Sequence, residues 1–292
     1  MFLILFFIFG SIVGSFLNVV ILRYNTGKTL SGRSQCFSCQ RKLRWHELLP
    51  VVSFLALRGK CRTCRSKISI QYPLVEFLTG VIFALTASKT LSLGVLFSNI
   101  DLQPPFYFSH IPIVYTLLTA YYLLLFSFLV VIFVYDLRHK IIPDTFVYLF
   151  IILSPLSLFL DQSSFEFQTV QFWDVLAGPL LFLPFFLMWF FSSGRWMGLG
   201  DGKLAWGIGW FLGLERGVSA ILFAFWLGAA VSLSLLFLSC VRRASLFRRY
   251  SLFPAFKNLT IKSEVPFAPF LIIGMWIVFF FNLSLTGIFA SL

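Results

Sequence analysis

Long runs of hydrophobic residues alternate with short polar segments along this chain. A helix that crosses the hydrocarbon core of a bilayer needs about 20 mainly apolar residues. The pattern therefore predicts eight transmembrane helices, at about 1–22, 73–88, 111–135, 144–160, 172–192, 203–214, 217–240 and 265–290. The sixth run is short and rich in glycine, so a half-span buried in protein is also compatible with it.

The first apolar run has no basic residue ahead of it, because the first one, Arg23, follows the run. A secretory signal carries its positive charge in front of the apolar stretch and ends in a small-residue cleavage site. We therefore expect residues 1–22 to be a retained transmembrane helix.

Lysine and arginine are concentrated in alternate loops. Four loops hold 21 of the 23 basic residues: 23–72, 136–144, 193–203 and 241–264. By the positive-inside rule these loops are cytosolic, which places both chain ends on the opposite side. The basic and aromatic segment 241–264 is typical of a chain that lies on an anionic membrane surface.

The composition agrees with a membrane protein, since 59% of residues are hydrophobic and 12% are charged. Soluble domains carry about 25% charged residues. The net charge of +12 does not indicate a nucleic-acid partner, because the basic residues follow the predicted topology. We predict an all-α polytopic membrane protein in three parts: 1–22 as the first transmembrane helix, 23–72 as a cytosolic loop domain, and 73–292 as a transmembrane core.

The loop domain contains two C-x2-C pairs separated by 21 residues: Cys36, Cys39, Cys61 and Cys64. Two such turns can present four thiolates to one zinc ion in a tetrahedron. Two disulfides are the alternative, but thiols stay reduced in the cytosol. A structural zinc ion would also replace the apolar core that about 50 polar residues cannot build.

Two aspartates stand where long apolar runs meet the predicted cytosolic side. Asp136 ends "VVIFVYD", and Asp201 lies between glycines in "GLGDGKL". Charged groups at this depth are costly and usually functional. The pair could share a proton, one acting as base for a water and the other as acid, while the glycines would let a substrate backbone approach.

The alternative is that each aspartate is an interfacial charge with a neighbour, Asp136 with Arg138 and Asp201 with Lys203. A third aspartate, Asp144, follows a proline and opens the fourth run. An N-terminal helix cap explains this residue, although it is also a reserve candidate for the pair.

The chain resembles the type IV prepilin peptidases, which combine leader peptidase and N-methyltransferase activities. The resemblance runs along nearly the whole chain and is carried by five motifs: "GSFLNVVILR", the segment from "CFSC" through "LRGKCRTC" to "ISIQYPLVE", "YDLRHKIIPD", "GLGDGKL" and "VPFAPFLIIG". Presenilin-like enzymes share the two aspartate motifs, but they lack a four-cysteine loop and carry a PAL motif that this chain lacks.

The resemblance implies that Asp136 and Asp201 are catalytic and that the four cysteines bind zinc. It places Gly59 and Lys60 in a stretch tied to methyl transfer from S-adenosylmethionine. The departures, such as the missing proline in "CFSC", affect the loop and hence methylation more than proteolysis.

We therefore expect an aspartyl endopeptidase of a prokaryotic inner membrane. It would remove the basic leader of prepilins or pseudopilins at the cytosolic face and N-methylate the new end. The alternatives are a peptidase without methyl transfer, or a non-enzymatic zinc-loop scaffold. The few acids that could meet the leader are Glu47, Glu76 and Asp144, and the resemblance does not decide among them. Membrane lipid is the other expected partner, and the sequence does not indicate an oligomeric state.

Overall fold

The structure, a computed structural model, describes residues 2–27, 29, 32–98, 111–159, 172–243 and 266–284. Within these ranges the chain forms α-helices and two 3-10 helices, with no strand beyond two isolated bridges. The elements in order are α1 (Phe2–Arg23), η1 (Trp45–Leu48), α2 (Val52–Ala56), α3 (Gln71–Ser98), α4 (Ile111–His139), α5 (Asp144–Leu153), η2 (Ser154–Phe159), α6 (Phe172–Ser192), α7 (Leu199–Leu212), α8 (Leu214–Arg243) and α9 (Ala268–Phe281).

Each of the eight predicted runs overlaps a helix among the described residues, and the all-α class is confirmed there. Four described helices are long and apolar enough to cross a membrane: Phe2–Arg23, Tyr115–His139, Phe172–Ser192 and Leu214–Phe237. The apolar helices at Asp144–Phe159 and Ala268–Phe281 are shorter. The total of eight spans therefore stays a prediction, and most of the predicted surface segment 241–264 lies outside the described residues.

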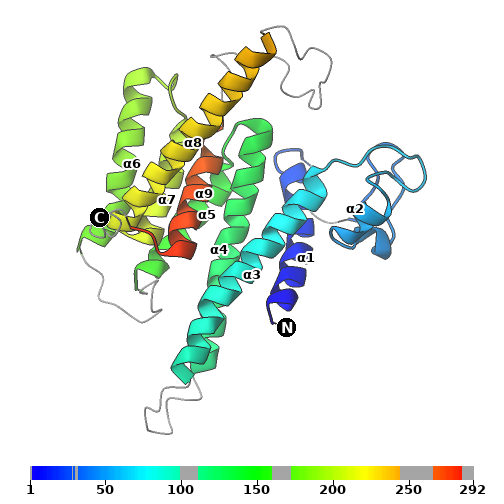
Figure 1. Cartoon of the computed structure of the whole chain (residues 1–292), viewed down its shortest axis with the longest axis horizontal. Helices are drawn as coiled ribbons and strands as arrows, with labels where there is room; N and C mark the ends of the chain where they lie inside the picture. The colour runs from blue at the N-terminus through cyan, green and yellow to red at the C-terminus, as the bar shows by residue number, and fades with distance from the viewer. Residues whose placement is uncertain are drawn as a thin grey trace. The chain divides into compact units, whose positions relative to one another are not determined.

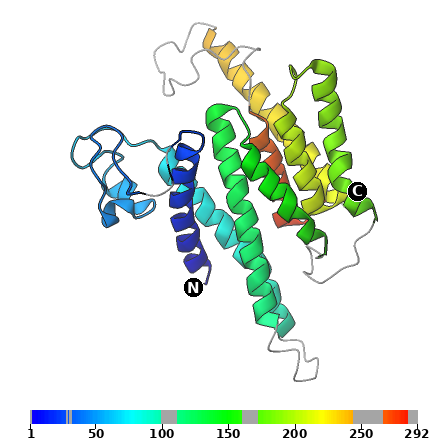
Figure 2. The same ribbon diagram turned by 180° about the vertical axis from the view of Figure 1, so that it is seen from behind.

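The chain divides into two compact units, Met1–Tyr135 and Asp136–Leu292. In the first unit, α1 packs along α3, and the two helices lie side by side in both ribbon views (Figures 1 and 2). Small residues allow this approach. A Cβ atom at Gly10 would lie 2.7 Å from Cβ of Phe83, and one at Gly14 would lie 2.9 Å from Cα of Glu76. Such small-residue contacts are the usual means by which membrane helices pack closely.

In the second unit, α7 is the central element, in contact with α5, η2, α6, α8 and α9. Its glycines bring the neighbouring helices near. A Cβ at Gly209 would lie 2.6 Å from the backbone oxygen of Ala177 on α6. The side chains of Leu204, Ala205, Ile208 and Phe211 are fully buried. A helix of 14 residues with this degree of burial is supported by the surrounding helices and not by lipid.

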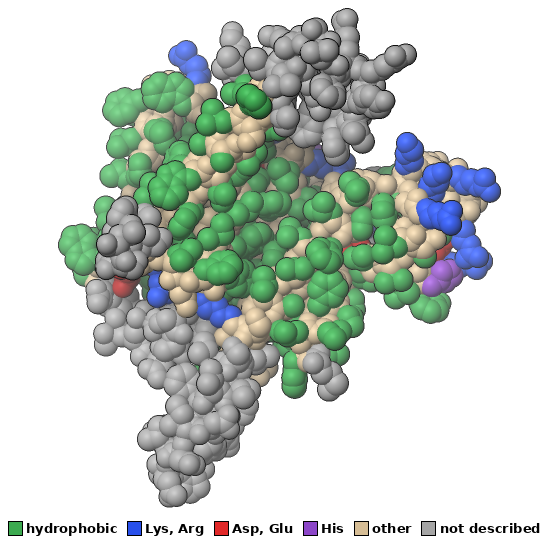
Figure 3. Space-filling model, in the orientation of Figure 1, with side chains coloured by type: hydrophobic (Ala, Val, Ile, Leu, Met, Phe, Trp, Pro, Cys, Tyr) green, Lys and Arg blue, Asp and Glu red, His purple; other side chains and the backbone are tan. Residues whose placement is uncertain are grey.

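Hydrophobic side chains also cover the outside of the helices (Figure 3). Phe2 on α1, Phe191 on α6 and Phe237 on α8 are each at least 70% exposed. An apolar surface of this extent marks a region that contacts lipid or another apolar partner. The structure thus supports the membrane class that the composition predicts.

The α1–α3 contact generates a prediction about stability. Gly14→Val places a branched side chain against Glu76 and Thr79, whose Oγ1 lies 3.0 Å from the position of the first added carbon. Overpacking of this kind destabilises by about 1–3 kcal/mol. We expect a lower thermal unfolding midpoint in detergent than for the control Ile12→Val, at an exposed position of the same helix. Equal midpoints for the two variants would show that this contact is not tight.

Candidate active site and metal centre

Asp136 lies three residues before the end of α4 and is only 4% exposed. Its carboxylate accepts a hydrogen bond from the backbone N–H of Ala268, the first residue of α9. The N-terminus of a helix carries a partial positive charge and free N–H groups. The start of α9 therefore offers the buried carboxylate a donor that is not itself ionised.

Asp201 lies in the first turn of α7 and is 8% exposed. Its carboxylate accepts a hydrogen bond from the backbone N–H of Gly198, the residue before the helix. This is the acidic half of a capping box, which satisfies a donor that the helix leaves open. The other oxygen, Oδ1, is buried and has no hydrogen-bond partner among the described residues. Because a buried polar atom without a partner is costly, Oδ1 is the atom that a water or substrate group would satisfy.

The two aspartates belong to the same unit, and the charge of Asp136 acts on the carboxyl group of Asp201. Neither forms an ion pair with a described residue, since the ion pairs found join Arg41 to Glu47 and Lys203 to Asp144. The alternative pairing of Asp201 with Lys203 is therefore wrong, and that of Asp136 with Arg138 is not found. Both aspartates are therefore buried and without an ion-pair partner among the described residues.

The glycines beside Asp201 pack against the chain's own side chains. A Cβ at Gly200 would lie 3.0 Å from Ile142, in the segment between α4 and α5. One at Gly202 would lie 3.2 Å from Phe182 on α6. We expected these glycines to admit a substrate backbone, whereas here they allow helices and a connecting segment to come close to Asp201.

Asp144 is not a helix cap, because α5 begins at this residue, after Pro143, and no side-chain cap bond forms. Its Oδ1 lies 2.6 Å from Nζ of Lys203 on α7. The ammonium group of Lys203 also lies 4.8 Å from the centre of the Tyr148 ring. The Asp144 side chain is 62% exposed, so its environment differs from that of the two buried aspartates.

The four cysteines of the loop domain come together as predicted. The Sγ atoms of Cys36, Cys39, Cys61 and Cys64 all lie within 4.8 Å of one another. Each pair sits in a turn with the same hydrogen bonds, Cys36 with Arg41 in one and Cys61 with Ser66 in the other. An isolated bridge closes each turn, between 35 and 42 and between 60 and 67. Four sulfur atoms on two matching turns can hold one metal ion.

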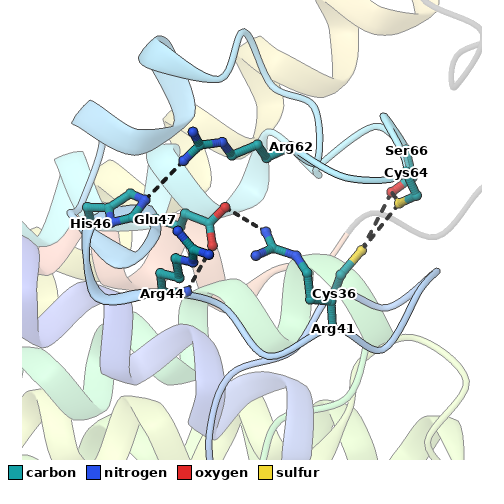
Figure 4. A network of polar contacts seen from close by, with 8 residues as sticks. All are labelled: Cys36, Arg41, Arg44, His46, Glu47, Arg62, Cys64 and Ser66. Carbon is teal, nitrogen blue, oxygen red and sulfur yellow. Dashed lines mark hydrogen bonds and ion pairs between the residues drawn. The ribbon is translucent and has the colours of Figure 1, made fainter.

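Hydrogen bonds favour the thiolate form at two of these positions. The backbone N–H of Cys39 donates to Cys36 and lowers the pKa of that thiol to about 6. The hydroxyl of Ser66 lies 3.1 Å from Sγ of Cys64 and lowers the pKa of Cys64. Figure 4 shows the Ser66 hydroxyl beside Sγ of Cys64, with Sγ of Cys36 facing both. Burial and the neighbouring Cys36 instead raise the pKa of Cys39 to about 11. Because thiolates are the form that binds metals, the lowered pKa values of Cys36 and Cys64 fit a metal centre.

A partly buried ion pair that the sequence analysis did not identify supports the first turn (Figure 4). Nη2 of Arg41 lies 2.6 Å from Oε1 of Glu47, and the backbone N–H of Arg44 donates to Oε2. The Arg41 guanidinium lowers the pKa of Glu47. Arg41 also interacts with the sulfur of Cys61, so it joins the two halves of the cysteine cluster.

Gly59 and Lys60 lie in the turn between α2 and the second cysteine pair. Gly59 has a φ of +65°, and its N–H and C=O bond to Phe54 and Ile68. A Cβ here would lie 3.0 Å from the Phe54 ring. Both backbone groups of Gly59 are thus used inside the loop, whereas the side chain of Lys60 is exposed.

Glu76 joins the loop domain to the helices of the first unit. It is 7% exposed, and its Oε2 accepts a hydrogen bond of 2.7 Å from the N–H of Val51. Ser15 on α1 also bonds to this carboxylate. Val51 has a φ of +59°, a strained conformation for a branched residue. The buried carboxylate therefore helps to hold a strained turn in place.

Comparison with known proteins identifies two matching families along the chain. Residues 8–90 match the bacterial peptidase A24 N-terminal domain, which includes the four cysteines. Residues 123–233 match the type IV leader peptidase family, which includes Asp136 and Asp201. The family resemblance predicted from the motifs is confirmed. No solved structure matches the chain.

Several curated relatives are named prepilin leader peptidase/N-methyltransferase. The protein of Myxococcus xanthus is 48% identical over 28% of this chain and 25% of its own length. That of Vibrio cholerae is 29% identical over 73% of this chain and 79% of its own length. That of Xanthomonas campestris is 27% identical over 94% of this chain and 89% of its own length. The chain thus spans about a quarter of the first of these relatives and most of the other two.

The cysteine cluster generates a prediction about metal content. We expect the purified protein to carry one divalent metal ion per chain, measured by elemental analysis, and Cys61→Ser to lose it because one of the four ligands is gone. The matched control is Cys240→Ser, which changes the fifth cysteine of the chain and should keep the ion. A metal-free wild type, or equal metal content in the two variants, would contradict a metal centre at the cluster.

Proposed function

Because the chain belongs to the type IV leader peptidase family, we propose that it is a membrane-embedded aspartyl endopeptidase that removes the leader of prepilins or pseudopilins. The observation that carries this proposal is the pair Asp136 and Asp201. Both are buried, their charges interact, and neither has a cationic partner among the described residues. Two carboxyl groups in such surroundings are suited to share one proton.

The chemistry follows from that shared proton. The ionised carboxylate takes a proton from a water, and the oxygen of that water attacks the carbonyl carbon of the scissile peptide bond. The other carboxyl group gives its proton to the carbonyl oxygen. When the tetrahedral intermediate collapses, the C–N bond breaks, the departing nitrogen receives a proton from the first carboxyl group, and a hydroxyl of the intermediate returns its proton to the second carboxylate. The unpartnered Oδ1 of Asp201 is suited to one of these transfers.

We propose that this site lies at the cytosolic rim of the inner membrane. Asp136 is near the C-terminal end of α4, and Asp201 is at the N-terminal end of α7. Both ends adjoin loops that the positive-inside rule assigns to the cytosol. In this topology the chain crosses the lipid eight times, and a leader held in the cytosol meets the carboxyl groups where its apolar helix enters the bilayer.

We propose that the four cysteines hold a structural zinc ion. The sulfur atoms fit the tetrahedral site that zinc prefers, and Cys61 is buried while Cys64 is exposed. Bound at four thiolates, zinc has no open position for a substrate. Its contribution is to fix the two turns, and Arg41 and Ser66 orient the sulfur atoms that bind it.

We propose that the new N-terminus is then N-methylated with S-adenosylmethionine as methyl donor. The support is the family and the N-methyltransferase named in its relatives. Of the two residues predicted for this activity, Lys60 has an exposed side chain that can reach a ligand. Gly59 has its backbone groups engaged within the loop, so it would act through the shape of the turn.

The proposal for the two aspartates generates a prediction about cleavage. Asp136→Asn and Asp201→Asn should each lower the rate of prepilin cleavage by roughly 10²–10⁴-fold, the usual share of a general acid or base. The control is Glu215→Gln, which removes an exposed acid at the start of α8 and should cleave normally. Cleavage is measured with purified protein and a prepilin. Wild-type rates in either asparagine variant would refute the proposed site.

The proposal for methyl transfer generates a separate prediction. Wild-type protein incubated with prepilin and S-adenosylmethionine should give a mature product one methyl group heavier than the product formed without the donor. Intact mass spectrometry measures the difference. Lys60→Gln should reduce methylation while leaving cleavage unchanged, because Lys60 is far in sequence from both aspartates. A cleaved but unmethylated wild-type product would leave a peptidase without transferase activity.

A further inference from the structure

Three acidic residues among those that the structure describes were expected to be able to meet a basic segment of the substrate, and one of the three is open to solvent. Glu47 is buried and bonded to Arg41, and Glu76 is buried and bonded to Val51. The side chain of Asp144 is 62% exposed. We infer that Asp144 is a specificity-determining residue, which binds a cationic side chain of the leader by exchanging its present partner, Lys203.

Asp144 lies on a segment that packs against the start of α7, where Asp201 is located. It is the first residue of α5, and Ile142, two residues before it, packs against Gly200 beside Asp201. Its partner Lys203 is two residues beyond Asp201 on α7. The three aspartates also belong to the same unit. A cation bound at Asp144 would therefore be held beside the segment that carries the proposed site.

The pair between Asp144 and Lys203 has the properties of an exchangeable contact. Oδ1 of Asp144 lies 2.6 Å from Nζ of Lys203; the Asp144 side chain is 62% exposed, whereas that of Lys203 is 20% exposed. Ion pairs of exposed groups contribute little net stability, because water competes with them. An incoming ammonium or guanidinium group offers Asp144 the same contact, so the cost of exchange falls on Lys203, whose side chain is mostly buried.

Lys203 has a second contact that remains when Asp144 binds a cation of the substrate. Its Nζ lies 4.8 Å from the centre of the Tyr148 ring, on the same helix as Asp144. A cation over an aromatic face is attracted by the ring electrons. Lys203 can therefore stay at the surface of α5 after exchange, instead of being left without any partner. In this arrangement Lys203 is a resident competitor of the substrate cation.

The alternative is a purely structural role, in which the ion pair only holds α5 against α7. The two accounts differ in what each partner does. A clamp needs both groups, so Asp144→Asn and Lys203→Met would have the same effect on every substrate. If Asp144 recognises the substrate and Lys203 competes for it, the two substitutions should have opposite effects on KM, and only for a substrate that carries the cation.

The experiment uses the full chain and two prepilins that differ only in the leader, one with its lysine and arginine residues and one with glutamine in their place. For the cationic leader, Asp144→Asn should lower kcat/KM about 2- to 5-fold, mainly through KM, the range expected for loss of one partly exposed ionic contact. Lys203→Met should lower KM. Both variants should cleave the neutral leader as the wild type does, and Glu215→Gln serves as the control.

The inference is overturned if Asp144→Asn affects both leaders equally or affects neither. It is also overturned if Lys203→Met mirrors Asp144→Asn. A charge reversal distinguishes a recognition role from poor folding. Asp144→Lys should cleave a leader carrying glutamate better than the wild type does, a gain that loss of folding cannot produce. Absence of that gain in a folded variant counts against the inference.

The inference rests on the proposed function, and the two can fail separately. If Asp136→Asn still cleaves prepilin, or the wild type does not, the proposed function fails and the inference with it. If the aspartate variants lose cleavage while the Asp144 variants do not distinguish the leaders, the peptidase proposal stands and only the recognition role is lost.

Discussion

The burial of two carboxyl groups inside an apolar helical assembly is the constraint on which the second unit depends. An unpaired ionised group in such surroundings is expensive, and the protein offers Asp136 and Asp201 backbone N–H donors from the first residue of α9 and the residue before α7. A lysine in the same place would neutralise them and abolish a shared proton. The one lysine near Asp201 along α7 is instead drawn to Asp144. The glycines of α7 then allow α6 and the 140–143 segment to approach closely enough to keep the pair buried.

The four-cysteine segment must be stable without a large apolar core. Several of its large apolar side chains are exposed, such as Phe37, Trp45 and Leu55, so it has little core of its own. A metal ion at four sulfur atoms can supply the missing stability. The ion pair of Arg41 with Glu47 and the bond of Glu76 to Val51 add polar links that tie the turns together and join the segment to the first unit's helices.

The long helices and the cysteine cluster could be predicted because their signals are local: apolar length in one case and C-x2-C spacing in the other. The pairing of Lys203 with Asp144 could not be predicted in this way. We placed Asp201 in a loop, where an adjacent lysine is a natural partner, but it lies in the first turn of α7. Residues two apart on a helix do not face each other, and the same holds for Asp136 and Arg138 on α4. The tie between Arg41 and Glu47 likewise depends on the cysteine turn bringing them together, which pattern alone does not reveal.

The central claim is that Asp136 and Asp201 form one site able to act on a peptide bond from both sides. The most direct measurement is a cryo-electron microscopy structure with a prepilin-derived peptide in which a hydroxyethylene group replaces the scissile bond. The account predicts that the hydroxyl group lies within hydrogen-bonding distance of both carboxyl groups. A bound peptide whose hydroxyl contacts neither aspartate, or two aspartates too far apart to share it, would contradict the claim.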